Sequence, residues 1–260
     1  AAGAGSDLAF DSVPPEMGVE LEMTNRARRS WRLMSEAERL DRDTLQRIKF
    51  DTVYDPAGYL THMLRQVRAI DTRGNERLTA ARALMLRWDR SADNVGRGDA
   101  IALLMVKEFM SASYQHKPWP DAREQLTKAA DHLMKHFGRL DPPMSEVLRL
   151  RQGPGPHSVD LPLDGGSDTL RASTTWDVAE DGRLAVRHGD SYILWAEWLP
   201  GQRVTSRSIQ PFGAATTRSN SVHYTDQSTL FVQHRFKPVH FWRDDVLANA
   251  KRRIVVRHRP

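Results

Sequence analysis

The hydrophobic residues of this chain change their spacing near residue 150, and this change constrains the fold more than any other feature of the sequence. Before residue 150, apolar side chains recur every three or four positions, which is the period of an α-helix. After it, they alternate over Leu170–Val178, as in a β-strand. Between the two regions, Arg151–Pro156 is dense in Gly and Pro and marks a boundary. We therefore predict an α+β chain, mainly helical over residues 1–150 and mainly β over residues 151–260.

The clearest helix is predicted over Ala122–Phe137. Asp121 and Glu124 have the spacing of a capping box, and Gly138 stands where a left-handed C-terminal cap is favoured. Ile101–Tyr114 is apolar on nearly every side, which predicts a helix buried among others. Three further helical stripes lie over Val19–Met34, Leu60–Ile70 and Leu78–Trp88.

The second half predicts short strands. After Leu170–Val178, Asp181-Gly182 favours a tight hairpin turn into Arg183–Val186. Tyr192–Leu199 is apolar on both faces, which predicts a strand that is covered on both sides in a layered structure. Further strands are predicted over Leu230–Phe236 and Ile254–Val256, and a short helix near Asp244–Ala250.

Composition excludes several kinds of chemistry. The chain has no cysteine, which excludes disulfides, thiolate metal ligands and a cysteine nucleophile. Its 38 Lys and Arg residues exceed the 33 Asp and Glu residues only slightly, and the two signs are interspersed. No apolar run reaches the roughly 20 residues that span a bilayer. Ala1–Gly5 lacks the pattern of a signal peptide and an initiating Met, so we expect the chain to begin inside a longer gene product.

Two segments near the end of the chain, His188–Ile193 and Ser219–Ser228, resemble in order and distance the C-terminal signature of the penicillin acylase family. These are N-terminal-nucleophile amide hydrolases, and the acyl-homoserine-lactone and aculeacin-type acylases are the most similar members. The resemblance extends from about Ser12 to Val256. Other segments that carry it are Asn25–Arg29, Phe50-Asp51, Leu86–Asp89, Phe137-Gly138 and Asp164–Ala172. The sequence departs from the family pattern at Met144, often Trp, at Val222, often Pro, and at Ala214-Ala215-Thr216, usually a small Ser/Gly turn.

The resemblance implies the C-terminal portion of a four-layered αββα N-terminal-nucleophile hydrolase, with both halves of this chain in one larger catalytic domain. It implies hydrolysis of a linear amide, such as an N-acyl-homoserine lactone or a β-lactam side chain, by an N-terminal serine outside this chain. The implied partners are the rest of the same precursor (the α-chain and the start of the β-chain) and a small acyl-amide substrate, with no cofactor. The chain alone would be inactive, and the location would be periplasmic or secreted.

Two other function classes compete with this one. A non-catalytic partner or binding module would retain the outer part of the acylase fold but would not hydrolyse an amide. A nucleic-acid-binding protein would use the basic residues Lys251–Arg253 and Arg257–Arg259, but no zinc, RNP or recognition-helix motif accompanies them. We therefore expect no nucleic-acid partner.

Arg26 is the candidate site residue. It lies seven positions after Val19, so a continuous helix would place it on the apolar side, where an arginine needs a partner. An ion pair or a snorkelling side chain is the structural explanation. In the family, an arginine a short helix after the oxyanion-hole asparagine supports the catalytic site, and the resemblance implies this supporting role for Arg26. The asparagine itself is expected before Ala1.

Four other patterns are weaker. Gly5-Ser6 is the dipeptide at which family precursors are cut, but the residues after it do not match, and Asp11 aligns too loosely with a family calcium ligand. An extended segment would separate Asp226 from Ser219, Ser221 and His223, so no catalytic triad is expected. His132 and His136 lack the glutamate of a zinc protease, and Asp164–Asp168 lacks the lysine of a phosphate loop. We interpret the last two patterns, and Ser219–Ser228, as structural.

Overall fold

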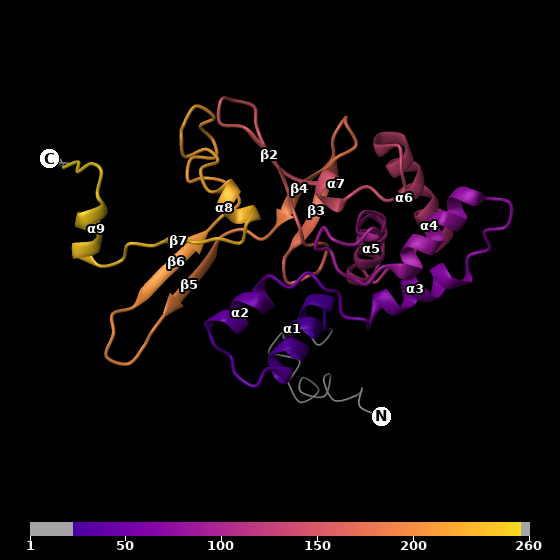
Figure 1. Ribbon diagram of the computed structural model, residues 1–260, viewed down its shortest axis with the longest axis horizontal. Helices are drawn as coiled ribbons and strands as arrows, with labels where there is room; N and C mark the ends of the chain where they lie inside the picture. Colours follow the sequence, from indigo (N-terminus) through magenta and orange to yellow (C-terminus); the bar gives the residue numbers. More distant parts are fainter. Residues whose placement is uncertain (1–22, 256–260) are drawn as a thin grey trace. The chain divides into compact units, whose positions relative to one another are not determined.

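A computed structural model describes residues 23–255 of the chain (Figure 1). Contacts divide these residues into two compact units. Unit 1 contains residues 23–153 and 159–190, and unit 2 contains residues 154–158 and 191–255. The chain has the α+β fold that the spacing predicts, with helices in its first half and strands after them. Each unit is described separately below.

Four helices of unit 1 pack around one central helix, α5. The helices of the unit are α1 (Asn25–Glu36), α2 (Arg42–Lys49), α3 (Tyr59–Ala69), α4 (Glu76–Arg87), α5 (Asp99–Tyr114), α6 (Ala122–Phe137) and α7 (Met144–Val147). α3, α4, α6 and α7 all contact α5. Most α5 residues up to Met110 are buried, because apolar side chains surround the helix axis. The prediction of a helix buried among others is confirmed.

Local signals set the ends of several helices. The side chain of Asp121 accepts a hydrogen bond from the backbone nitrogen of Glu124 at 2.8 Å and caps the start of α6. At the other end, Gly138 has φ +69°, a left-handed conformation that glycine adopts without steric cost. Asn75 caps α4 in the same way as Asp121, with its side chain bonded to the nitrogen of Leu78. The predicted bounds of α6 are confirmed at both ends.

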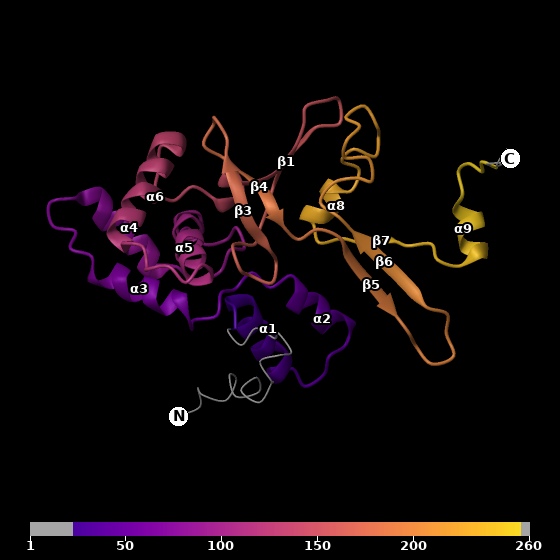
Figure 2. The same ribbon diagram turned by 180° about the vertical axis from the view of Figure 1, so that it is seen from behind.

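A four-stranded sheet completes unit 1. Its strands are β1 (Leu148–Gln152), β2 (Val159–Pro162), β3 (Ser173–Val178) and β4 (Leu184–Gly189), in the order β2-β1-β4-β3. β1 and β2, and likewise β3 and β4, are antiparallel, whereas β1 and β4 are parallel, so the sheet is mixed. β3 lies beside α5 in both ribbon views (Figures 1 and 2), with Lys107 Nζ 5.3 Å from the ring centre of Trp176.

Gly and Pro residues fall at the turns of this sheet. Gly182 turns the chain between β3 and β4 with φ +79°, which confirms the predicted hairpin. Arg151–Pro156 includes the end of β1 and part of its connection to β2, where Gln152 pairs with Val159. The Gly-Pro stretch thus lies between two strands of one sheet.

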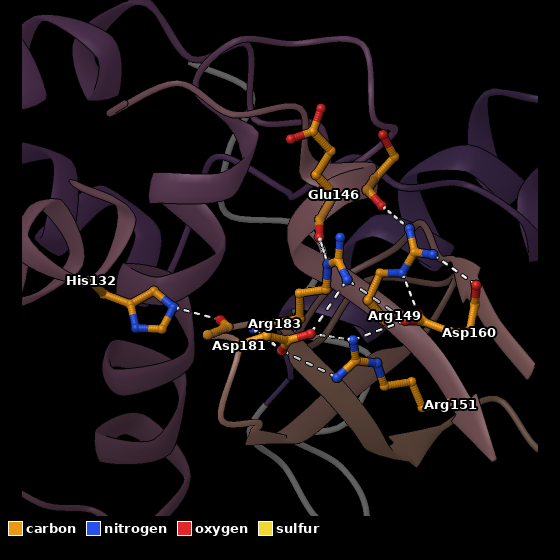
Figure 3. Close-up of polar contacts among 9 residues, drawn as sticks. His132, Glu146, Arg149, Arg151, Asp160, Asp181 and Arg183 are labelled. Atoms are coloured by element: carbon orange, nitrogen blue, oxygen red, sulfur yellow. Dashed lines mark hydrogen bonds and ion pairs between the residues drawn. The ribbon is translucent and has the colours of Figure 1, made fainter. Parts of the chain in front are cut away.

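Arginines and aspartates form an exposed network at one edge of this sheet (Figure 3). Arg149 Nε lies 2.6 Å from Asp160 Oδ1, and Arg151 Nη2 lies 2.6 Å from Asp181 Oδ2. Arg183 contacts the same aspartates. The hydrogen bond from Arg151 holds the pKa of Asp181 down to about 2. Ion pairs this exposed contribute about 1 kcal/mol or less each, so the network mainly fixes the β1–β2 edge against the hairpin turn.

Unit 2 contains a small antiparallel sheet and two short helices. Its elements are β5 (Ile193–Glu197), β6 (Thr205–Ile209), α8 (Ser228–Val232), β7 (Lys237–Pro238) and α9 (Arg243–Asn249), with the sheet in the order β5-β6-β7. In β5 the side chain of Ile193 is buried, but Leu194 and the flanking Tyr192 and Trp198 are exposed. Within the described residues this strand is therefore not covered on both sides.

Two strand predictions in unit 2 are wrong. Leu230–Phe236 contains most of the helix α8 rather than a strand, because a short apolar run has no period that separates the two structures. The helix turns Phe231 into the core of the unit. Ile254 and Val255 are exposed and belong to no strand, and Val256 lies outside the described residues. The short helix predicted near Asp244–Ala250 is present as α9.

None of the helices in residues 23–255 is both long enough and apolar enough to cross a membrane.

Candidate functional site

The candidate residue Arg26 lies in the first turn of α1. Thr24 caps this helix, and its hydroxyl accepts a hydrogen bond from the nitrogen of Ala27 at 3.1 Å. The helix that contains Arg26 therefore begins at Asn25, and Val19, from which the sequence predicted a continuous helix, lies outside the described residues. Arg26 is half-buried for a different reason from the one the sequence indicated. Its Nε donates a hydrogen bond to the carbonyl oxygen of Thr169 at 2.9 Å.

Asp168 holds the start of α1. Its carboxylate accepts hydrogen bonds from the backbone nitrogens of Asn25 at 2.8 Å and of Arg26 at 3.2 Å. These nitrogens have no partner inside the helix, and the positive end of the helix dipole favours a carboxylate here. Asp168 and Thr169 thus contact both the backbone and the side chain of Arg26. This double contact fixes where the guanidinium lies.

Tyrosine hydroxyls complete the surroundings of Asp168. The hydroxyl of Tyr59 lies 3.5 Å from Asp168 Oδ2, and Tyr114 also hydrogen-bonds to this carboxylate. Burial raises the pKa of Asp168, while the hydrogen bonds from Tyr114 and the two backbone nitrogens counteract part of the rise. Burial, and then the charge of Asp168, raise the pKa of Tyr59 well above its ordinary value. The tyrosines therefore keep their protons and act as donors.

Two other arginines of α1, Arg29 and Arg32, have carboxylate partners. Arg29 forms a two-bond pair with Asp51, at 2.9 Å and 2.8 Å, and Arg32 lies 2.9 Å from Asp55. Within residues 23–255, by contrast, the Arg26 guanidinium forms no ion pair with a carboxylate. Arg26 is thus held by a neutral carbonyl oxygen, and no carboxylate in the described part of the chain cancels its positive charge by direct pairing.

A cleft of about 380 Å³ opens beside the start of α1. It is lined by the beginning of this helix, the loop before α3 and the end of α5, including Asn25, Arg28, Tyr59, Tyr114 and Trp119. The indole of Trp119 stacks on the His62 ring with 4.7 Å between ring centres. The cleft therefore combines aromatic walls with hydroxyl and amide groups. That combination can receive a small ligand with both apolar and polar parts.

The Gly-rich turn Asp164–Ala172 is built around a fully buried arginine. Arg171 Nε pairs with Asp164 at 2.9 Å, and its Nη1 lies 3.2 Å from Asp190. Lys49 Nζ lies 2.7 Å from the same Asp190 carboxylate. Two cations and two carboxylates satisfy one another here, which the burial of a charge requires. This arrangement agrees with the structural role inferred from the sequence.

The segment Ser219–Ser228 is a series of turns. His223 Nδ1 and Asp226 Oδ2 lie 2.7 Å apart, so the assumption of an extended segment, which would separate these two residues, is wrong. The backbone nitrogen of His223 donates to Ser221 Oγ at 3.1 Å, and both His223 and Asp226 are exposed. The backbone of this segment pairs with Gly213 and Ala215. A structural role for the segment fits this geometry.

The remaining candidates form no ligand set. His132 Nε2 contacts the carbonyl oxygen of Gly182 at 2.9 Å, and the His136 ring lies 4.9 Å from the His132 ring. In the described part of the chain, no three His, Asp or Glu side chains are placed to hold a metal ion together. Ser6 and Asp11 lie outside the described residues.

Sequence reasoning missed Asp168, Thr169 and the tyrosines as neighbours of Arg26. From the sequence, Asp168 is only one residue of the Gly-rich turn Asp164–Ala172, which we interpret as structural rather than as a phosphate loop. Its left-handed backbone, φ +68°, follows a Gly-Gly turn, and that turn is the one local signal that could have singled it out. Its contact with α1 crosses more than 140 positions of sequence, which no local pattern reveals.

Comparison with known proteins agrees with this structure. The family model for penicillin amidase matches residues 6–248, which is nearly the whole chain. The chain therefore belongs to the penicillin amidase family, whose members hydrolyse amides. No curated protein matches the chain.

Proposed function

We propose that this chain forms part of an amidase whose serine nucleophile lies in another segment of the same precursor. The substrate would be a linear acyl amide, such as an N-acyl-homoserine lactone or the side-chain amide of a β-lactam. Units 1 and 2 would both belong to one catalytic domain of the αββα type. Membership of the family supports the reaction class, and the arrangement around Arg26 supports the role of this chain.

The placement of Arg26 carries the proposal. Amide hydrolysis passes through a tetrahedral intermediate whose oxygen becomes negatively charged, and fixed donors or cations near that oxygen lower the barrier. A cation suits this role when its position is fixed and its charge is not already neutralised. Arg26 has both properties, since Asp168 fixes its backbone, Thr169 fixes its Nε and no described carboxylate pairs with its guanidinium. It would support the oxyanion-hole asparagine.

We also infer a periplasmic or secreted location, which rests on the family alone. Proteolytic separation of α- and β-chains would accompany export, and the α-chain would be a permanent partner of this chain.

The coding sequence upstream of Ala1 provides the first test. The complete reading frame should be expressed and the first residue of each mature chain determined. The proposal expects one mature chain to begin with serine, and the purified enzyme to release amine from N-acyl-homoserine lactones or penicillins. A complete protein without an N-terminal nucleophile and without amine release would instead be a non-catalytic partner.

In that enzyme, R26A should lower kcat by about 100-fold, the size expected for losing one group that stabilises the oxyanion, with little change in KM. R26K should restore part of the rate, because it keeps a positive charge. R65A, which removes an exposed arginine of α3, is the matched control and should leave kcat unchanged. Equal kcat values for R26A and R65A would show that Arg26 does not support catalysis.

A further inference from the structure

The net charge of the chain is concentrated in one short stretch. Five of the 38 Lys and Arg residues lie in residues 249–260, and none of the 33 Asp and Glu residues does. Residues 1–248 therefore hold 33 residues of each sign and have no net formal charge, while the basic segment, residues 249–260, has the entire +5. The penicillin amidase match ends at residue 248, so this segment lies outside it. The charge thus belongs to a feature that the family match does not explain.

Apolar side chains accompany these charges and are exposed to solvent. Ile254 and Val255 follow Lys251–Arg253 directly, and both side chains are about two-thirds exposed. On the other side of the basic cluster, Phe241 is 65% exposed, and α9 exposes Val246 and Leu247. The region from Phe241 to Val255 therefore combines exposed aromatic and aliphatic groups with adjacent basic groups.

The acidic groups nearby have partners inside unit 2. Asp244 pairs with Arg203 at 2.7 Å, and Asp245 lies 2.9 Å from His240 Nδ1. Arg203 also lies over the ring of Trp242, 5.1 Å from its centre. Lys251, Arg252 and Arg253 exceed Asp244 and Asp245 in number, so the region presents a positive charge that its own carboxylates do not cancel.

The region is also attached to the body of unit 2. Trp242 Nε1 donates a hydrogen bond to the carbonyl oxygen of Val204 at 2.9 Å, directly before β6. The nitrogen of Val239 donates to the carbonyl oxygen of Ser206 at 2.9 Å. The residues that lead into α9 are thus fixed to the sheet, while the side chains named above face solvent.

We propose that residues 241–255 bind the surface of an anionic lipid bilayer. Basic side chains are attracted to acidic headgroups, and apolar side chains enter the boundary between headgroups and acyl chains. A nucleic acid would use the charges but would gain little from Ile254, Val255 or Leu247. The combination of both kinds of exposed group therefore favours a lipid surface. This inference is independent of the catalytic role proposed above.

Vesicle binding tests the charge component. The protein expressed from the complete reading frame should sediment with vesicles of phosphatidylcholine containing 30% phosphatidylglycerol, and not with pure phosphatidylcholine. Each basic side chain near an anionic surface raises partitioning roughly fivefold, so K251Q/R252Q/R253Q should weaken binding by about 100-fold. The matched control R65Q/R68Q/R87Q removes the same charge from exposed arginines of α3 and α4 and should bind like the wild type. If both triple variants lose binding equally, net charge alone is responsible and the proposal fails.

Neutral substitutions test the apolar component. I254S/V255S leaves the charge unchanged and should weaken vesicle binding by roughly tenfold, because it removes apolar groups that enter the bilayer. Unfolding curves should coincide with those of the wild type, since both residues are exposed. Vesicle binding unaffected by I254S/V255S would overturn the proposal. So would a higher affinity for a duplex DNA or RNA oligonucleotide than for the vesicles, or the absence of vesicle binding.

Discussion

The carboxylate of Asp168 accepts a hydrogen bond from the backbone nitrogen of Asn25 at 2.8 Å, across 143 positions of sequence. This contact joins the Gly-rich turn before β3 to the first residue of α1. The next nitrogen along the helix, that of Arg26, bonds to the same carboxylate, and the Arg26 side chain bonds to Thr169. One buried acid therefore determines the position of the residue to which the family resemblance assigns a supporting role.

Replacing this acid should destabilise the chain. D168A leaves two backbone nitrogens and the Tyr59 hydroxyl without their acceptor in a buried place, and we expect a loss of about 3 kcal/mol in the free energy of unfolding. D168N keeps one acceptor oxygen and tolerates the left-handed backbone, so it should lose about half as much. Urea unfolding followed by circular dichroism measures both. If D168A unfolds at the wild-type urea concentration, Asp168 does not anchor the helix.

The buried arginine of the Gly-rich turn should be more important for stability than an exposed one. R171M removes the ion pair with Asp164 and weakens the cluster at Asp190, and we expect a loss of about 3 to 5 kcal/mol. R187A breaks the exposed pair with Asp177 and should cost about 0.5 kcal/mol. Thermal unfolding of the two variants in parallel gives the comparison. Similar melting temperatures would contradict the buried-network interpretation.

Two glycines that both have a positive φ should differ in their tolerance of a side chain. Gly165 has φ +82°, and a Cβ there would lie 2.0 Å from the carbonyl oxygen of Arg171. Gly74 has φ +72°, but a Cβ there meets open space. G74A should therefore cost only about 1 kcal/mol of backbone strain, whereas G165A should cost several times more, because the backbone of the turn must move. Equal losses in urea unfolding would mean that the close approach at Gly165 is relieved cheaply.

Asp99 should make stability depend on pH. Burial, and then the charges of Asp93 and Asp89, raise the pKa of Asp99 from 3.8 to about 7. Because the folded chain holds this proton where the unfolded chain has released it, stability should fall as the pH rises from about 4 to about 7. The loss of stability is complete once the pH exceeds the pKa of Asp99 in the folded chain.

D99N cannot ionise and should remove this fall. The free energy of unfolding of D99N, compared with that of the wild type at the same pH, should therefore increase by a few kcal/mol from pH 4.5 to pH 8. E180Q, at an exposed turn position, is the control and should follow the wild type at both pH values. The free energies of unfolding come from urea titrations at the two pH values. A constant difference between D99N and the wild type would show that Asp99 titrates near its ordinary pKa.

Part of this fold was predictable because its signals are local. The end signals of α6, Asp121 and Gly138, act within one turn of the helix, so the sequence contains all the information they need. The same holds for the turn at Gly182. The prediction of a strand around Leu230 was wrong because its local signal was ambiguous. A run this short fits a strand or a helix, and the choice of helix places Phe231 in the core of unit 2.

By itself, the sequence determined that the chain is α+β, that its apolar period changes near residue 150 and that its segments resemble an amidase family, because periodicity and motif order are written along the chain. It also pointed to Arg26. Only the tertiary structure decided what holds Arg26: a carboxylate and a carbonyl oxygen from a turn more than 140 residues away. The physical reason is that a buried polar group must find its partner wherever packing places one, and packing joins segments without regard to their distance in sequence.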